Sequence, residues 1–217
     1  MTTLLLIRHG ENDFVKTNKM AGRLPGVHLN ERGKEQAAAL ANALDPLPLK
    51  AIYASPLERA VETAQPLADS HKLEIIQIPD LMDIDIGKWQ GRSWKVLSRS
   101  KVWRIVQQAP SRFIFPEGES FLDAQTRLVA AVEKIAAAHK PRDIVAIVFH
   151  ADPIKLVISH YLGLPLDRFQ RLGISTGSTS VLWVTEMSAH LMKMNLTPPF
   201  ELPMPPKNRV KKERKKK

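Results

Sequence analysis

The pattern of apolar and polar residues divides the chain into two kinds of segment, which alternate along it. Some runs are short, continuous and apolar, which is typical of strands buried on both faces of a sheet. The runs that predict strands are residues 4–7, 51–54, 74–78 and 144–149. Other segments repeat apolar residues at helical spacing between polar ones. The segments that predict helices are residues 31–44, 56–70, 93–106, 119–138 and 153–162. The last two runs, residues 180–186 and 190–195, predict a β-hairpin.

This alternation of strands and helices indicates an α/β fold, and we expect residues 1–197 to form one domain. Two helix starts are marked by their capping residues. Asn30 predicts one N-cap, and Ser55 followed by Pro56 predicts another. Residues 198–217 contain prolines and then lysines and arginines, so we expect a disordered tail there.

The net charge of +10 comes mostly from the end of the chain. Residues 207–217 contain eight basic residues and one acid, which leaves 24 basic and 21 acidic residues in the other 206. The body of the protein is therefore nearly neutral. The tail could bind nucleic acid or an acidic surface weakly, or it could be a solvated end without a partner.

Three absences narrow the class of protein. The chain has no cysteine, which excludes disulfides, thiolate nucleophiles and cysteine-bound zinc. It has no run of about 18 apolar residues, so no membrane-spanning helix is predicted. No secretory signal is visible at the amino end. Together these features favour a cytoplasmic location, and they give no indication of oligomeric state.

Two of the predicted buried strands end on a histidine. His9 follows Arg8 at the end of the first strand, and His150 follows residues 144–149. If the strands are parallel neighbours, both imidazoles emerge at one edge of the sheet, where α/β folds bind ligands. Arg59 lies near the start of a helix close to the same edge. Such a group suits an anion such as phosphate. Histidine pairs also bind zinc, but the arginines disfavour a cation, so a metal site is the minor alternative.

The segments that carry these residues resemble, in order, the motifs of the histidine phosphatase superfamily, also called phosphoglycerate-mutase-like. The matching segments are Arg8-His9-Gly10-Glu11, residues 21–33, residues 55–64, Leu81-Met82-Asp83, residues 87–91, residues 116–120 and Val148-Phe149-His150. Together they cover about residues 3–190. The resemblance implies a three-layer α/β/α sandwich with a mostly parallel central sheet.

The resemblance also implies a role for each matched residue. His9 would attack phosphorus and become a phosphohistidine, and an imidazole can do so without a separate base. The groups that would hold the phosphate oxygens are Arg8, Arg59 and His150. The further phosphate- or substrate-binding positions are Gly10, Asn12, Gly22, Arg23 and Ala151. Because the pocket supplies its own positive charge, neither a metal nor a cofactor is expected.

The leaving oxygen needs a proton, and the family places an acid after the third strand. Asp83 occupies this position, where many relatives have glutamate. Its shorter side chain leaves Asp85 as an alternative donor. Asp152 is either a helix cap or a contact to a substrate hydroxyl. Val15 stands where many relatives have an asparagine beside the phosphate, which favours the phosphatase branch over the mutases.

Residues 89–117 form a candidate lid rich in aromatic side chains, which either stack on the substrate or pack the lid itself. The sequence therefore predicts a metal-independent phosphomonoesterase that acts on a small phosphate ester. A phosphomutase of the same chemistry is the alternative. A non-enzymatic binding module that uses the basic tail is the second alternative.

Overall fold

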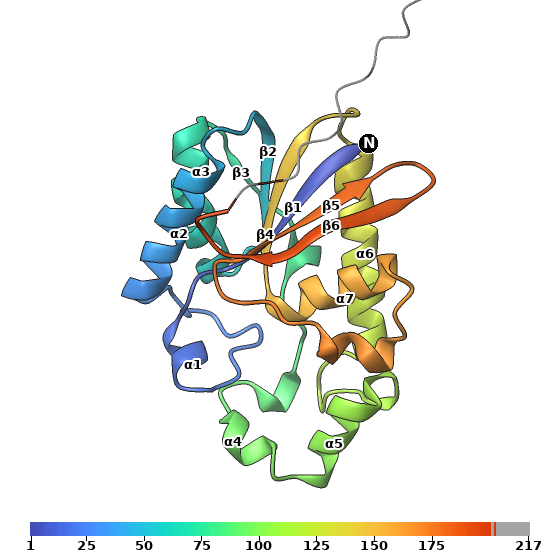
Figure 1. Cartoon of the computed structure of the whole chain (residues 1–217). Helices are drawn as coiled ribbons and strands as arrows, with labels where there is room; N and C mark the ends of the chain where they lie inside the picture. Colours follow the sequence, from blue (N-terminus) through green and yellow to red (C-terminus); the bar gives the residue numbers. More distant parts are fainter. Residues whose placement is uncertain (201, 203–217) are drawn as a thin grey trace, which may run out of the picture.

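The protein is built around a six-stranded sheet (Figure 1). The computed structural model describes residues 1–200 and 202. In spatial order the strands are β3 (Ile75–Gln77), β2 (Leu49–Ala54), β4 (Ile144–Phe149), β1 (Thr2–Arg8), β5 (Thr179–Val184) and β6 (Ala189–Leu196). The first four in this order are parallel, whereas β5 is antiparallel to β1 and β6 is antiparallel to β5. The predicted mostly parallel sheet and the final hairpin are confirmed.

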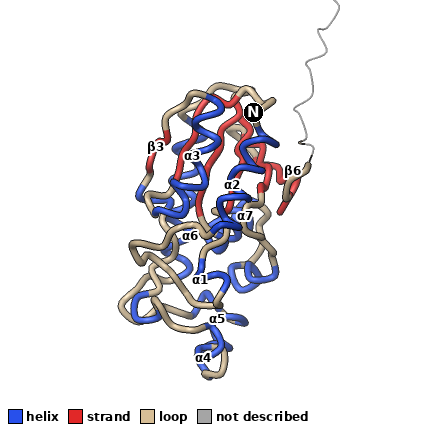
Figure 2. The backbone as a smooth tube through the Cα atoms, turned by 90° about the vertical axis from the view of Figure 1, so that its left-hand side faces the viewer, coloured by secondary structure: helices blue, strands red, loops and turns tan. Residues whose placement is uncertain are grey.

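Helices cover both faces of the sheet (Figures 1 and 2). One face carries the first two long helices and the other carries the last two: α2 (Glu31–Leu44) and α3 (Glu58–His71), then α6 (Phe121–Ala137) and α7 (Ala151–Tyr161). Strand β1 shows the reason, because side chains alternate along a strand. Leu5 and Ile7 join the apolar cluster under α2 and α3, whereas Leu4 and Leu6 join the one under α6 and α7. The predicted three-layer α/β/α sandwich is confirmed.

Short elements fill the connections between the long ones. They are α1 (Asp13–Lys16), α4 (Trp94–Leu97), α5 (Lys101–Gln108), and the 3₁₀ turns η1 (Pro79–Leu81), η2 (Gly87–Trp89), η3 (Pro110–Arg112) and η4 (Leu166–Arg171). The single helix predicted over residues 93–106 is wrong, because the chain breaks between α4 and α5. Ser100 starts the second helix, since its side chain accepts the N–H of Trp103. Both helices belong to the lid, which we define as residues 89–117. They lie beyond the carboxyl ends of the parallel strands, at the bottom of Figure 1.

Of the predicted helix starts, one is confirmed and two are corrected. Asn30 caps α2, since its side chain accepts the N–H of Gly33. Ser55 does not cap α3, which begins three residues later, because the N–H of Ser55 still donates to the Val148 carbonyl beyond the end of β2. Asp152 does not cap α7, because His150 occupies the capping position.

The packed part of the chain extends slightly past residue 197. Phe200 and Leu202 are partly buried and pack against the cluster under α2 and α3. The prediction of disorder for the remainder of the tail, at residues 201 and 203–217, lies outside the described residues. Within residues 1–200, no helix combines the length and the apolarity needed to cross a bilayer.

Candidate active site

The sheet brings the two strand-end histidines together. Strands β1 and β4 are parallel neighbours, and Arg8 is in register with Phe149. His9 and His150 follow at the same edge, with ring centroids 5.2 Å apart in an edge-to-face arrangement. Both side chains are buried. The prediction that the two imidazoles emerge at one edge of the sheet is confirmed.

Two arginines stand beside the histidines, each anchored by a backbone carbonyl. Arg59 lies in the first turn of α3 and is only 1% exposed. Arg8 Nη1 donates to the carbonyl of Ile174 at 2.6 Å, and Arg59 Nη2 donates to the carbonyl of Gly22 at 2.7 Å. These two bonds fix the guanidinium groups in the wall of the site.

The ring of His9 is held in one tautomer. Its Nδ1 lies 2.7 Å from the carbonyl oxygen of Gly10, which can only accept a hydrogen bond. Nδ1 therefore carries the proton, and Nε2 keeps its lone pair. Burial, reinforced by the charges of Arg59 and Arg8, lowers the pKa of His9 well below its usual value. The neutral ring presents an unprotonated Nε2, the state that a nucleophile requires.

The ring of His150 is held in the opposite tautomer. Its Nε2 lies 2.9 Å from Ser55 Oγ, which also accepts the N–H of Leu57. Because the Ser55 hydroxyl has no other acceptor among the described residues, its hydrogen is satisfied by donating to Nε2, and burial lowers the pKa of His150 and keeps the ring neutral. The single ring proton sits on Nδ1, 3.8 Å from Asp83 Oδ2. Sequence reasoning missed this role of Ser55, although the residue follows β2 directly at the same edge of the sheet.

Several buried donors around the histidines have no hydrogen-bond partner among the described residues. They are Arg8 Nε, Asn12 Nδ2, Arg59 Nε, Arg59 Nη1 and His150 Nδ1. A buried polar group left unpaired costs about 1–3 kcal/mol, so a cluster of them indicates a ligand. Because every member donates, the ligand must supply acceptors, as phosphate oxygens do.

A cavity of about 170 Å³, which we call the phosphate cavity, lies beside these donors, and all of their residues except His150 line it. Arg8, His9, Asn12 and Arg59 line it, together with Ala151 at the first turn of α7. The amino terminus of this 11-residue helix adds a partial positive charge. The size and the donor set of the cavity both suit a phosphoryl group.

Asp83 also lines the phosphate cavity, with Oδ2 3.3 Å from Arg59 Nη2. Burial raises the pKa of Asp83 to about 6, and the charge of Arg59 opposes the rise only in part. Asp85 instead accepts the N–H of Gly87 at 3.0 Å and faces Arg23 at 3.7 Å, outside the cavity wall. Of the two predicted proton donors, Asp83 is the one that lies within reach of a bound ester.

Gly10 does not contribute the backbone donor expected of it. Its N–H donates to Thr63 Oγ1 at 2.9 Å, and the residue does not line the phosphate cavity. A Cβ at position 10 would lie 2.5 Å from the carbonyl oxygen of Gly33, so glycine is required here for close packing against α2. Asn12 lines the cavity, as expected of a phosphate-binding residue. Its Oδ1 accepts the N–H of Val15, so its amide Nδ2 remains the unpaired donor.

Gly22 and Arg23 lie outside the phosphate cavity and support its wall. Gly22 holds Arg59 through its carbonyl. Arg23 Nε donates to the carbonyl of Asp83 at 2.8 Å, and its Nη2 pairs with Glu119 at 2.9 Å. These bonds tie the Asp83 segment to the start of α6. The two residues therefore orient other site residues, and their role in binding a phosphate ester directly stays a prediction.

A second cavity, of about 250 Å³, lies next to the first under the lid, and we call it the lid cavity. Ala21, Asp83 and Asp152 line both cavities, so the two are neighbours. Packing of the lid by its aromatic side chains is confirmed, and stacking on a substrate stays a prediction. Trp89 and Phe113 are buried and pack the lid, whereas Trp94 and Trp103 line the cavity.

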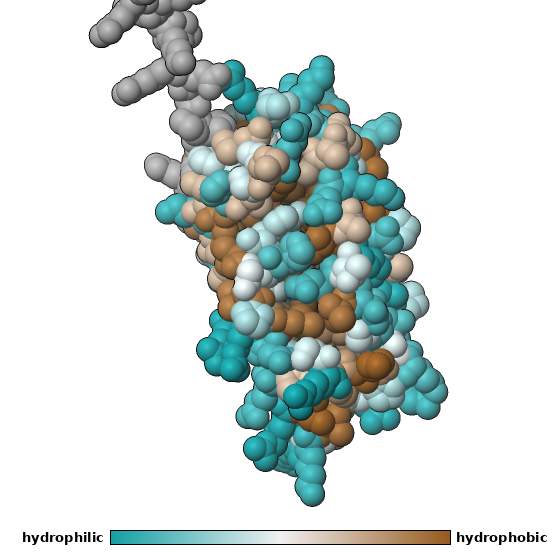
Figure 3. Space-filling model, turned by 90° about the vertical axis from the view of Figure 1, so that its right-hand side faces the viewer, coloured by the Kyte–Doolittle hydropathy of each residue, from teal (hydrophilic) through white to brown (hydrophobic). Residues whose placement is uncertain are grey.

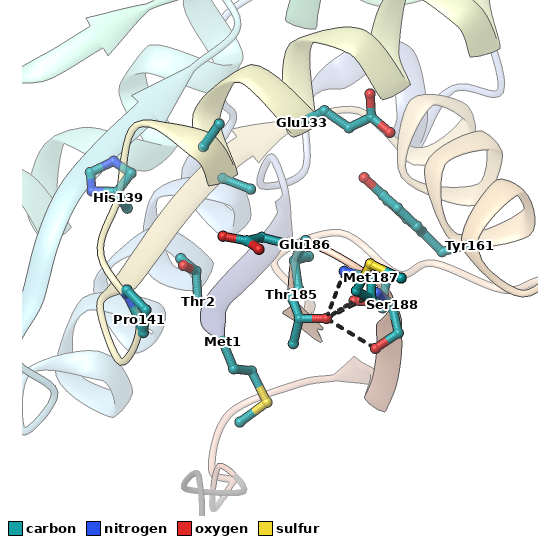
Figure 4. Close-up of a pocket in the computed structure, with 14 residues that line it drawn as sticks. Met1, Thr2, Glu133, His139, Pro141, Tyr161, Thr185, Glu186, Met187 and Ser188 are labelled. Carbon is teal, nitrogen blue, oxygen red and sulfur yellow. Dashed lines mark hydrogen bonds between the residues drawn. The ribbon is translucent and has the colours of Figure 1, made fainter.

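A larger cavity, of about 580 Å³, opens at the other end of the sheet, around Met1 and Thr2 (Figure 4). Figure 4 shows it bounded by Tyr161, Glu133 and the turn between β5 and β6. No arginine or lysine lines it, so it does not match the chemistry of the phosphate cavity. In the part of the chain that the structure describes, no three His, Cys, Asp or Glu side chains gather as a metal site would require.

Comparison with known proteins agrees with this geometry. Residues 4–197 match the family model described as the histidine phosphatase superfamily (branch 1). Phosphoserine phosphatase 1 of Hydrogenobacter thermophilus is 31% identical over 199 residues, which cover 91% of this chain and 93% of that protein. The 2,3-bisphosphoglycerate-dependent phosphoglycerate mutase of Thermoplasma acidophilum is 29% identical over 182 residues, 84% of this chain and 87% of that one. Among solved structures, YhfR of Bacillus stearothermophilus has a TM-score of 0.83 at 29% identity and covers 89% of this chain and 96% of its own.

Proposed function

Because the chain belongs to the histidine phosphatase superfamily, we propose that it hydrolyses small phosphate monoesters through a phosphohistidine formed on His9. The observation that carries the proposal is the phosphate cavity. It combines a free Nε2 of His9 with unpaired donors on Arg8, Arg59 and Asn12. These donors suit the three peripheral oxygens of a phosphoryl group, where charge accumulates in the transition state.

In the first step, Nε2 of His9 gives its lone pair to phosphorus while the bond from phosphorus to the leaving oxygen breaks. Asp83 in its protonated form donates its proton to that oxygen, so the alcohol leaves neutral. In the second step, water attacks the phosphohistidine and Asp83 takes the proton of the water. The P–N bond breaks and its electron pair returns to Nε2, which restores the enzyme.

Phosphoryl transfer to a second alcohol is the alternative, since one relative is a phosphoglycerate mutase. The same phosphohistidine would then be attacked by an isomer of the product instead of water. A single assay separates the two activities: a mutase interconverts phosphoglycerate isomers faster than it releases phosphate, and a phosphatase does the reverse. A binding module without catalysis has no need of an unprotonated nucleophile in a buried anion cavity.

The proposal includes a cytoplasmic location, which rests on the absence of cysteine. It also includes weak contact of residues 207–217 with nucleic acid or an acidic surface, which rests on their charge alone. Neither is needed for turnover at the phosphate cavity.

The decisive experiment replaces the nucleophile. His9→Ala should reduce phosphate release from p-nitrophenyl phosphate to less than about a hundredth of the parent rate, because covalent catalysis is lost. His190→Ala is the matched control, since His190 is exposed on β6 and should leave the rate unchanged. The parent enzyme should form an acid-labile phosphoenzyme and should keep its activity in excess chelator. Retention of more than about a hundredth of the rate by His9→Ala would exclude His9 as the sole nucleophile.

A further inference from the structure

The lid cavity bears on which phosphate esters the enzyme prefers, because it can hold the alcohol part of the ester. A phosphoryl group in the phosphate cavity directs its leaving oxygen toward Asp83, the proposed proton donor. Because Asp83 and Asp152 line both cavities, the lid cavity is the space beside the proposed proton donor that can hold the alcohol. The walls of that second cavity are therefore the contacts of the leaving group.

Apolar side chains form about half of the lid cavity wall, and aromatic rings are prominent among them. Trp94 and Trp103 contribute two indole rings, packed edge to face with centroids 5.4 Å apart. Phe115 and Phe121 form the buried side, with Ile84 and Ile86 beside them. For comparison, an apolar cavity of about 150 Å³ can bind benzene. A cavity of about 250 Å³ therefore has room for one ring and a small substituent.

The polar part of the wall includes an ion pair in which Lys155 is already bonded to its neighbours. Lys155 Nζ donates to Asp152 Oδ1 at 2.9 Å and to Gln170 Oε1 at 3.4 Å. Among the described residues that line the cavity, Lys155 is the one cation, and its side chain is 15% exposed. Asp152 neutralises that charge, and Asp83 adds further negative charge above its pKa of about 6. The wall offers no uncompensated cation to a carboxylate.

An ammonium group has three N–H donors, and Asp152 and Gln170 engage two of those on Lys155. The third can donate to a neutral acceptor, such as a hydroxyl or carbonyl oxygen. A carboxylate would instead have to compete with Asp152 for the same ammonium and would lie near a like charge. Like charges brought together in a partly buried site are strongly unfavourable.

We infer that the enzyme prefers phosphate esters of uncharged, largely apolar or aromatic alcohols with one hydrogen-bond acceptor away from the ester. Esters whose alcohol carries a carboxylate, phosphoserine and phosphoglycerate included, are poor substrates. The inference rests on the proposed function, since it concerns the leaving group of that reaction. It makes Asp152 a specificity-determining residue, because its negative charge neutralises Lys155 and so disfavours binding of an anionic group there.

The test compares benzyl phosphate with its 4-hydroxymethyl and 4-carboxy derivatives. The three leaving alcohols have nearly equal acidity, so the chemical step is matched and differences report the lid cavity. We expect kcat/KM for the 4-carboxy ester to be at least about tenfold below that for benzyl phosphate, mainly through KM. The 4-hydroxymethyl ester should be at least as good a substrate as benzyl phosphate, and phosphoserine should be worse than both.

The variant Asp152→Asn supplies a gain of function, which misfolding cannot imitate. Without the carboxylate, Lys155 has no counter-ion and can pair with the carboxylate of the substrate. The ratio of kcat/KM for the 4-carboxy ester to that for benzyl phosphate should therefore rise about tenfold. Using the ratio cancels any effect of the substitution on phosphate binding. Glu117→Gln is the matched control. Glu117 is the last residue of the lid, pairs with Lys88 and lines neither cavity. It should leave the ratio unchanged.

Two results would overturn the inference while leaving the proposed function intact. One is a preference of the parent enzyme for the 4-carboxy ester or phosphoserine over benzyl phosphate, with His9-dependent release of phosphate. The other is an unchanged ratio in Asp152→Asn. If the enzyme instead releases no phosphate from any of these esters or from p-nitrophenyl phosphate, the proposed function fails and the inference falls with it.

Discussion

At the scale of single residues, the two site histidines use different ring nitrogens in their hydrogen bonds to the protein. His9 is held through Nδ1 by the Gly10 carbonyl, and His150 is held through Nε2 by Ser55. The Gly10 carbonyl can only accept, and the Ser55 hydroxyl has no acceptor but His150 among the described residues, so the two partners select opposite tautomers. One ring is thereby left with a lone pair and the other with an N–H. This difference in hydrogen-bond partner suits His9 to its proposed nucleophilic role and His150 to its proposed oxygen-binding role.

We predict that Ser55→Ala lowers kcat about tenfold or more, because His150 loses the partner that fixes its proton on Nδ1. Steady-state kinetics with p-nitrophenyl phosphate measures the effect. Ser159→Ala is the control: Ser159 is equally buried, but its hydroxyl donates to the Leu156 carbonyl within α7. Similar losses of kcat in both variants would mean that Ser55 serves packing alone.

Asp83→Asn should slow benzyl phosphate much more than p-nitrophenyl phosphate, because only the poor leaving group needs a proton. Asp85→Asn is the control and should change both rates by less than about twofold, since Asp85 lies outside the phosphate cavity. Equal losses on the two esters in Asp83→Asn would show that Asp83 binds or positions the substrate and does not donate a proton.

The raised pKa of Asp83 gives this donor a pH dependence with a definite sign. The carboxyl is protonated below about pH 6 and loses its proton above it. For benzyl phosphate, kcat/KM should therefore fall as the pH rises through about 6, whereas p-nitrophenyl phosphate should respond less. A profile for benzyl phosphate that rises through this range would contradict the assignment.

The chemistry at the strand ends was predictable from sequence, because it depends on local pattern. An apolar run that ends on Arg8-His9 and another that ends on His150 place those side chains at a sheet edge. The role of Gly10 was not predictable, since its N–H is engaged by Thr63, a residue distant in sequence. The hydrogen bonds of Arg23 to Asp83 and Glu119 could not be predicted either, because these partners are also distant in sequence.

At the scale of elements, the lid departs most from the sequence pattern. The apolar spacing of residues 93–106 predicts one helix, yet Ser100 caps a separate α5. Breaking the helix lets the two parts lie at an angle, so Trp94 and Trp103 can meet edge to face. Periodicity reports which face is apolar, but it does not report where a chain turns.

The 3₁₀ turn η2 packs against the segment before α6 with backbone touching backbone. A Cβ at Gly87 would lie 2.1 Å from the carbonyl oxygen of Pro116, whereas a Cβ at Gly26 would meet nothing within 4 Å. Both glycines have positive φ. Gly26→Ala should therefore cost only about 1 kcal/mol, for the backbone conformation.

Gly87→Ala should destabilise the protein by at least about 2 kcal/mol more than Gly26→Ala, because it adds a clash that no flexible side chain can relieve. Denaturant unfolding of the two variants measures the difference. Equal losses would show that the contact between η2 and Pro116 relaxes without cost.

At the scale of the whole molecule, the lid carries both basic side chains and exposed apolar ones. The buried arginines are in the phosphate cavity, whereas most of the net charge lies in residues 207–217. Exposed apolar side chains gather on the lid and just after it, and Figure 3 shows apolar surface at that end of the molecule. The exposed lid residues are Trp94, Val96, Val102, Ile105 and Ile114.

Truncation after Pro206 should leave turnover of p-nitrophenyl phosphate unchanged within about twofold, because the cut keeps Phe200 and Leu202, which pack against the body. Any affinity for an oligonucleotide should fall, and in the full chain it should weaken steeply with salt. Kinetics and fluorescence anisotropy measure the two effects. A large fall in turnover would mean that the basic residues reach the phosphate cavity.

The position of β1 has a consequence for how the chain is made. This strand carries His9, the proposed nucleophile, at its end, and it lies between β4 and β5, with Leu4 opposite both Val145 and Leu182. During synthesis the first apolar strand therefore stays unpaired until its partners, more than 130 residues later in the chain, have been made. Loops of that length make folding slow and leave the early strand open to aggregation. A nascent chain stopped before β4 has a nucleophile but no second histidine and no sheet to hold it, so catalytic competence arrives only with the last third of the protein.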